Sequence, residues 1–121
     1  MIQATRVVVA ERDGVPFVEL HGEHDVNDAP HLRQLLLEDL AESPRLVLDV
    51  RETTFVDSTV VAVFLSAHRR RRNAGGGIAL VVGDGVLRRM FEIMRLDQVF
   101  DTYATPSAAL ASMPTRSRAV S

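Results

Sequence analysis

Residues 45–73 read RLVLDVRETTFVDSTVVAVFLSAHRRRRN, and this stretch sets the architecture of the chain. Apolar residues occupy both alternating faces of residues 46–50, which is typical of a central strand covered on both sides. Residues 60–68 carry apolar side chains around much of a helical wheel, so we expect a largely buried helix that ends in residues 69–73. Between strand and helix, residues 53–57 should turn the chain. The stretch therefore predicts a strand-turn-helix unit at the centre of an α/β domain.

The segments on either side of this unit continue the alternation of strands and helices. A Pro sits where the first turn of the first helix is expected, and Asn27 or Asp28 can cap that helix, while Asp84 can cap the third. The further expected elements are strands at 6–10, 15–21, 78–82 and 99–103, and helices at 29–40, 85–94 and 106–112. The order ββαβαβαβα predicts a single domain with a mixed central sheet and helices packed against it.

Length and composition narrow the classes of protein to consider. The chain has 121 residues, 46% of them hydrophobic, which suits one folded domain over 1–113 followed by a disordered polar tail over 114–121. A formal charge of −2 gives no overall attraction to nucleic acid or anionic lipid. The chain has no Cys, which excludes disulfides and thiolate catalysis. No apolar run is long enough to span a bilayer, and we expect a cytoplasmic protein without membrane insertion.

Two polar segments are expected to meet at one edge of the sheet. If the second and third strands are parallel neighbours, their carboxyl ends share that edge, which brings residues 22–25 close to residues 56–59. Asp57, Ser58 and Thr59 supply the oxygens that cap the N–H groups of a helix, and capping alone is sufficient to explain them. The edge is nevertheless the natural place for a site.

The order of several short motifs resembles the STAS domain, and most of all the free-standing anti-sigma factor antagonists. The resemblance covers roughly residues 5–112. The motifs are Gly22-Glu23-His24-Asp25, Ala29-Pro30 before a leucine helix, Phe55-Val56-Asp57-Ser58-Thr59, a Gly-rich turn after the second helix, Val86-Leu87-Arg88-Arg89-Met90-Phe91-Glu92, and Leu96-Asp97. Each motif is weak by itself, but their joint order is fairly specific.

This resemblance implies a binding module rather than an enzyme, with no cofactor and no metal. Such proteins bind an anti-sigma factor and free a sigma factor. The anti-sigma factor is an ATP-dependent serine kinase that phosphorylates the serine of the motif, here Ser58, and a phosphatase reverses the modification. The partner-binding residues implied are Glu23, His24, Asp25, Asp57, Ser58, Thr59, Val60 and Val61. The formation of a weak homodimer is a further possibility that the sequence leaves open.

The sequence departs from the family pattern at Val60. The family usually continues with glycine and then leucine, whereas this chain has Val60-Val61. If the glycine serves close approach of a partner, Val60 could obstruct it. The alternative is therefore a STAS scaffold that is not phosphorylated, or a transport-associated regulatory subunit.

Other chemistry has less support from the residues. A serine hydrolase would need a histidine beside Ser58 and a Gly-x-Ser-x-Gly elbow, which is missing. The basic run 68–72 falls in the last turns of a helix, where we expect a solvated face rather than a nucleic-acid site. Residues 83–85 lack the lysine of a P-loop, and no histidine spacing fixes a metal geometry.

Overall fold

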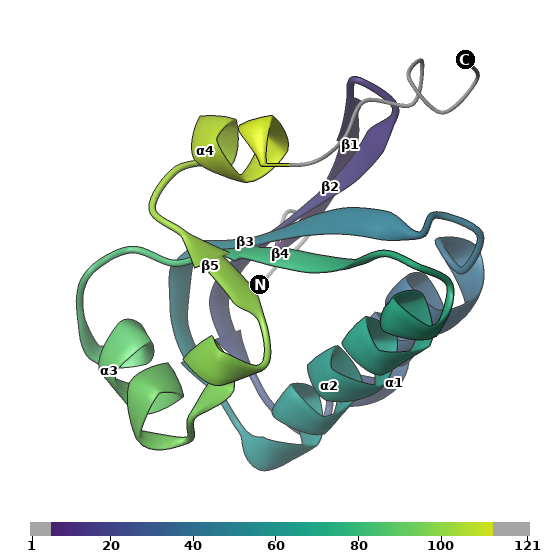
Figure 1. The fold of residues 1–121 in the computed structure, drawn as a ribbon. Coiled ribbons are helices and arrows are strands. Elements are labelled where there is room, and N and C mark those ends of the chain that lie inside the picture. The colour runs from purple at the N-terminus through teal and green to yellow at the C-terminus, as the bar shows by residue number, and fades with distance from the viewer. Residues whose placement is uncertain (1–5, 113–121) are drawn as a thin grey trace, which may run out of the picture.

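The strands of the sheet lie in the order in which they occur in the chain, β1-β2-β3-β4-β5. The computed structural model describes residues 6–112, and the expected tail lies outside them. The strands are β1 (Val7–Arg12), β2 (Val15–His24), β3 (Arg45–Val56), β4 (Gly77–Val81) and β5 (Asp101–Tyr103). β1 is antiparallel to β2, and every later pair is parallel. The predicted mixed sheet is confirmed (Figure 1).

Helices cover the two faces of this sheet unequally. Helices α1, α2 and α3 lie on one face, and within residues 6–112 only the short α4 lies on the other (Figure 1). The helical elements are α1 (Ala29–Gln34), the π-helical turn η1 (Leu35–Asp39), α2 (Ser58–Asn73), α3 (Val86–Ile93), the 3-10 turn η2 (Leu96–Gln98) and α4 (Pro106–Ala111). The predicted element order ββαβαβαβα is confirmed, with two short turns added.

The core consists of two layers that β3 separates. Leu46, Leu48 and Val50 face the large cluster under α1, α2 and α3. Val47 faces the smaller cluster, which contains Ala109 from α4. Both faces of residues 46–50 are therefore buried, as the uninterrupted apolar run predicts.

Four local expectations need correction. Residues 53–56 continue β3 instead of turning, because they pair with the carboxyl end of β2. Helix α2 accordingly begins at Ser58, earlier than its apolar run. Gly85, not Asp84, stands at the N-cap of α3, without a side-chain bond. Asp28 stands at the N-cap of α1, but its carboxylate bonds elsewhere, as described below.

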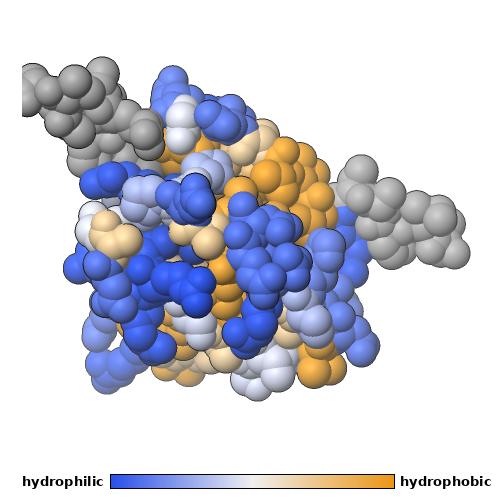
Figure 2. Space-filling view, turned by 90° about the vertical axis from the view of Figure 1, so that its right-hand side faces the viewer, coloured by the Kyte–Doolittle hydropathy of each residue, from blue (hydrophilic) through white to orange (hydrophobic). Residues whose placement is uncertain are grey.

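The basic run at the end of α2 is only partly solvated, contrary to expectation. Hydrophilic residues, with hydrophobic areas between them, cover the side of the molecule that Figure 2 shows. Arg69, Arg70 and Arg72 are exposed. Arg71, however, is only 1% exposed. Its guanidinium donates to the carbonyl oxygens of Leu36 at 2.9 Å and Leu40 at 2.6 Å. These carbonyls lie in and just after the π-helical turn, where backbone acceptors need donors from outside the helix.

The same end of α2 is anchored by His68, which is also buried. Its Nδ1 accepts a hydrogen bond from the N–H of Ile78 at 3.0 Å, at the start of β4. Burial lowers the pKa of His68, so the ring is neutral at pH 7.

Among residues 6–112, no helix is both long enough and apolar enough to cross a membrane.

Candidate functional site

The carboxyl ends of β2 and β3 meet at one edge of the sheet, as the sequence predicts. Glu23 pairs with Phe55 and His24 with Val56 in the parallel register. One step further, the N–H of Asp57 donates to the carbonyl of His24 at 3.2 Å. The strand ends are thus joined by backbone bonds up to Asp57, the N-cap residue of α2.

Asp57 caps the first turn of α2. Its backbone is extended, and its Oδ1 accepts a hydrogen bond from the N–H of Val60 at 3.1 Å. The hydroxyl of Thr59 donates to the same oxygen at 2.5 Å. The Thr59 hydroxyl above all, with the backbone N–H groups of Val60, Thr59 and Val26, lowers the pKa of Asp57. The Asp57 carboxylate is therefore ionised at neutral pH, and it already accepts hydrogen bonds within the first turn of α2.

Ser58 and Thr59 differ in what their hydroxyls do. Both residues are exposed in the first turn of α2. The Thr59 hydroxyl is bonded to Asp57, whereas no hydrogen bond of the Ser58 hydroxyl is found within residues 6–112. Ser58 therefore presents a hydroxyl to solvent at the positive end of a helix, where a negative charge is favourable.

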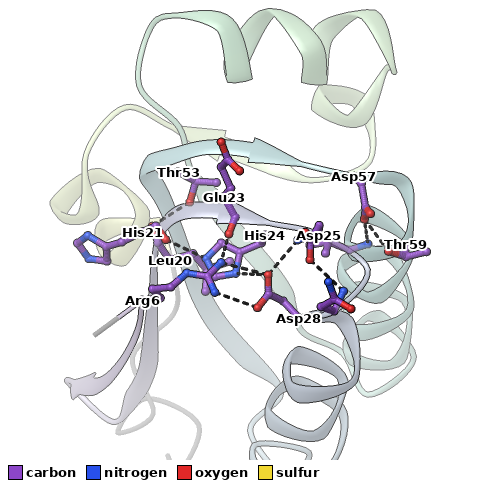
Figure 3. Close-up of polar contacts among 12 residues, drawn as sticks. Arg6, Leu20, His21, Glu23, His24, Asp25, Asp28, Thr53, Asp57 and Thr59 are labelled. Carbon is purple, nitrogen blue, oxygen red and sulfur yellow. Dashed lines mark hydrogen bonds and ion pairs between the residues drawn. The ribbon is translucent and has the colours of Figure 1, made fainter. Parts of the chain in front are cut away.

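The loop after β2 is held by a compact set of bonds to Asp28 (Figure 3). The Asp28 carboxylate accepts from Arg6 at 3.0 Å and from the N–H of Asp25 at 3.0 Å. The Arg6 guanidinium also donates to the carbonyl of Glu23. Partial burial opposes ionisation of Asp28, but the Asp25 N–H and the Arg6 guanidinium outweigh it and lower the pKa of this carboxyl. The loop is thus built around an ionised Asp28 and leaves the Glu23 and Asp25 side chains exposed.

His24 lies beneath this loop and is only 1% exposed. Its Nε2 donates to the carbonyl of His21 at 3.1 Å, which makes Nδ1 the unprotonated nitrogen of the neutral ring. Among the described residues Nδ1 finds no hydrogen-bond partner, and it faces a carboxylate oxygen of Asp28 at 3.8 Å. Burial first, and then the positive charge of Arg6, lowers the pKa of His24, which keeps the ring neutral at pH 7.

The expected partner surface therefore needs a correction. Val60 is fully buried and Val61 is 4% exposed, because both side chains belong to the core under α2. In this structure His24, Val60 and Val61 offer no surface to a partner. The remaining expected residues, Glu23, Asp25, Asp57, Ser58 and Thr59, all lie at the shared edge with partly or fully exposed side chains.

Two apolar residues at the same edge were not among the predicted site residues. Val26 is 55% exposed in the loop after β2, and Phe55 is 45% exposed near the end of β3. The signal in the sequence is faint, since Phe55 belongs to a motif that also contains the buried Val56, and Val26 is a single apolar residue among polar ones. Only the structure tells which of these side chains the core leaves outside.

Comparison with known proteins places the chain among relatives of one kind. The profile of the STAS domain matches residues 6–109. An anti-sigma-B factor antagonist of Bacillus subtilis is 30% identical over 87 residues, covering 72% of this chain and 80% of the relative. The anti-sigma-F factor antagonist RsfB of Mycobacterium tuberculosis is 29% identical over 108 residues, covering 88% of each protein.

Solved structures agree with this placement. An anti-sigma factor antagonist from Mycobacterium paratuberculosis superposes with a TM-score of 0.79 at 28% identity, covering 88% of this chain and 91% of the other. A Thermotoga maritima protein described as a putative anti-sigma factor antagonist has a TM-score of 0.81 at 18% identity, covering 88% and 92%. At that identity the second likeness concerns the fold alone.

Proposed function

This chain belongs to the STAS domain family, and from that premise we propose that it is an anti-sigma factor antagonist switched by phosphorylation of Ser58. In this proposal it binds an anti-sigma factor that is also an ATP-dependent serine kinase, and thereby frees a sigma factor in the cytoplasm. A phosphatase returns the module to its binding form. The protein is the substrate of both enzymes and carries out no reaction itself.

The observation that carries the proposal is the exposed Ser58 hydroxyl at the first turn of α2. Phosphoryl transfer needs an accessible hydroxyl aligned with the γ-phosphate of the donor nucleotide. The Ser58 hydroxyl is accessible without any rearrangement of the chain. The Thr59 hydroxyl would first have to leave its 2.5 Å bond to Asp57. The geometry thus favours Ser58 over its neighbour as the acceptor.

Asp57 is not suited to serve as the base that takes the Ser58 proton. Its carboxylate has a lowered pKa and already accepts from Thr59 and Val60. A weaker base is a weaker proton acceptor, and the Oδ1 of Asp57 already accepts two hydrogen bonds. The proton acceptor for the reaction must then come from the kinase or from the nucleotide phosphate itself, which fits a module that waits for a partner to act on it.

A phosphate on Ser58 is compatible with the fold but not with an unchanged surface. It adds about −1.5 to −2 charges at a helix N-terminus, where the free N–H groups and the helix dipole accommodate an anion. In a bound kinase, the new phosphate would face the phosphates of the ADP product at close range. Steric bulk and repulsion then act together, and each 1.4 kcal/mol lost weakens binding about tenfold.

The alternative of a scaffold that is not phosphorylated rested on Val60 obstructing the partner. Val60 is fully buried in the core, so its side chain cannot meet a partner in this structure. This burial supports the phosphorylated module over the scaffold, because the Val60 side chain packs in the core under α2.

The proposal is tested with the full chain, ATP and the purified anti-sigma kinase of the same organism. Intact-mass measurement should detect one added phosphate, and peptide mapping should assign it to Ser58. Ser58→Ala should bind the kinase and gain no phosphate, while Thr59→Val should still be phosphorylated. Absence of both binding and phosphorylation would refute the proposal, and a phosphate on Thr59 alone would move the switch to that residue.

A further inference from the structure

We propose that Val26 and Phe55 are the apolar anchors of the partner interface, framed by the carboxylates of Glu23, Asp25 and Asp57, and that they fit a kinase surface with an apolar centre and basic groups around it. The inference rests on the proposed function, because it takes the kinase that acts on Ser58 as the occupant. It adds the residues that supply affinity and the chemistry of the partner surface.

The loop after β2 carries Val26 two residues beyond His24, whose carbonyl accepts a hydrogen bond from the N–H of Asp57 at the start of α2. The loop is pinned from below, since Asp28 bonds to the N–H of Asp25 and to Arg6. The N–H of Val26 lies close enough to the Asp57 carboxylate to contribute to its lowered pKa. The Val26 side chain remains 55% exposed on this fixed support. An apolar side chain held rigidly in solvent loses little conformational freedom when a partner covers it.

Phe55 is placed by the last pairs of the sheet. It lies opposite Glu23 in the parallel register and precedes Asp57 by two residues. Its ring is 45% exposed, although the neighbouring Val56 is buried. Helix α4 packs over β3, β4 and β5. Its Ala109 belongs to the same buried cluster as Val47 and Ala79. Within residues 6–112, the ring of Phe55 therefore stays partly exposed, three positions before Ser58 in the chain.

The charges around these two residues indicate what a partner must supply. Glu23 and Asp25 are exposed and Asp57 is partly exposed, and all three lie on the segments that flank Ser58. Arg6, which approaches from below the loop, is already bonded to Asp28 and to the Glu23 carbonyl. Acidic groups around an apolar pair match a partner surface with basic groups around an apolar patch.

Two other exposed apolar residues provide the comparison that makes this testable. Val86 is 80% exposed and Ile93 is 75% exposed, both on α3. They are more exposed than Val26 and Phe55, so exposure alone would rank them higher. No residue of the Ser58 turn, and none of the three carboxylates, bonds to α3 within residues 6–112. Val86 and Ile93 therefore serve as matched controls that lie outside the proposed interface.

The experiment is a calorimetric titration of the full chain with the purified anti-sigma kinase of the same organism, loaded with ADP. Val26→Ala and Phe55→Ala should each weaken binding by about tenfold or more, as truncation of buried interface anchors does. Val86→Ala and Ile93→Ala should change the affinity less than about twofold by the same reasoning. Asp25→Asn should weaken binding and reduce its dependence on salt, whereas Asp97→Asn should do neither.

Each outcome separates the inference from the function on which it rests. If the wild type binds the kinase and both Val26→Ala and Phe55→Ala bind equally well, the anchors are wrong and the function stands. If the α3 variants weaken binding as much, the interface lies elsewhere. If the wild type binds no anti-sigma kinase, the proposed function fails and the anchors fail with it. Circular-dichroism melts should overlay for all variants, and Phe55→Ser provides a second test if Phe55→Ala lowers the melting temperature.

Discussion

The two ends of helix α2 are built in opposite ways. At its start, Asp57 caps the first turn, and Ser58 and Thr59 face solvent. At its end, Arg71 is buried against carbonyls of the preceding helical segment, and His68 receives a hydrogen bond from the start of β4. The end of α2 is tied to the rest of the molecule by side chains, whereas its start is held by the Asp57 cap and by the backbone bond from Asp57 to His24.

Under the proposed function, this difference lets α2 carry a phosphorylation switch without unfolding. The buried residues Val60, Phe64 and Ala67, together with the anchored last turns, hold α2 against the sheet. A change of charge at Ser58 then acts on a helix terminus whose position is already fixed by these buried residues and by the last turns of α2. We call the end of α2 with His68 and Arg71 the closed end, and its start with Ser58 and Thr59 the open end. The comparison predicts that substitutions at the closed end change stability and that substitutions at the open end change binding.

Arg71→Ala should cause the largest loss of stability. It removes the donors to the carbonyls of Leu36 and Leu40, and a buried acceptor left without a partner costs about 1–3 kcal/mol. We expect a loss of about 3 kcal/mol or more in the free energy of unfolding, measured by urea denaturation. Arg72→Ala, at the exposed neighbouring position, should be close to wild type. Equal effects of the two substitutions would mean that the closed end is not held by Arg71.

Val60→Gly should cause the next largest loss. Glycine costs about 1 kcal/mol relative to alanine within a helix, and the missing methyl groups leave a cavity in the core that costs roughly as much again. We expect a loss of about 2 kcal/mol in the free energy of unfolding on those grounds. Affinity for the kinase should stay the same, because the Val60 side chain is buried. Tighter binding by Val60→Gly would revive the idea that valine obstructs the partner.

Asp57→Ala should have a smaller effect on stability. The substitution removes the cap from the N–H of Val60 and releases the Thr59 hydroxyl. We expect the melting temperature to fall by a few degrees, with Asp57→Asn falling less because its amide oxygen can still cap the helix. With the kinase and ATP, peptide mapping should find part of the phosphate on Thr59 in Asp57→Ala. Phosphate confined to Ser58 would count against a role of Asp57 in the choice of acceptor.

Ser58→Asp should have the smallest effect on stability and a large one on binding. The new carboxylate lies at a helix N-terminus, where a negative charge is tolerated or favourable. The melting temperature should match the wild type, while affinity for the kinase falls at least about tenfold as the neutral hydroxyl contact is lost. Wild-type affinity for Ser58→Asp would argue against a switch based on charge.

The architecture could be predicted from the sequence because its signals are local. The apolar residues at 46–50 indicate a strand buried on both faces, and parallel strands bring residues 22–25 and 56–59 to one edge whatever the side chains do. The exposed Ser58 turn follows from capping preferences and from the family resemblance together. These inferences need no knowledge of distant contacts.

The burial of individual polar residues could not be predicted in this way. Arg71 belongs to a run that looks solvated, and its burial depends on carbonyls of Leu36 and Leu40, more than thirty positions away in the chain. His24 likewise lies in a polar motif, yet the loop pinned by Asp28 covers it. Whether Phe55 is covered depends on how far α4 extends over the sheet. Such outcomes are decided by which distant element packs nearby.

Strand order that follows chain order also has a consequence for synthesis on the ribosome. Each strand that emerges can pair at once with the strand before it, so the nascent chain has no need to wait for a distant segment. The large core under α1, α2 and α3 is complete once Phe100 is available, but the opposite layer needs Ala109. Until that last helix leaves the ribosome, the growing molecule presents an apolar sheet face to its surroundings, and self-association is most dangerous in that interval.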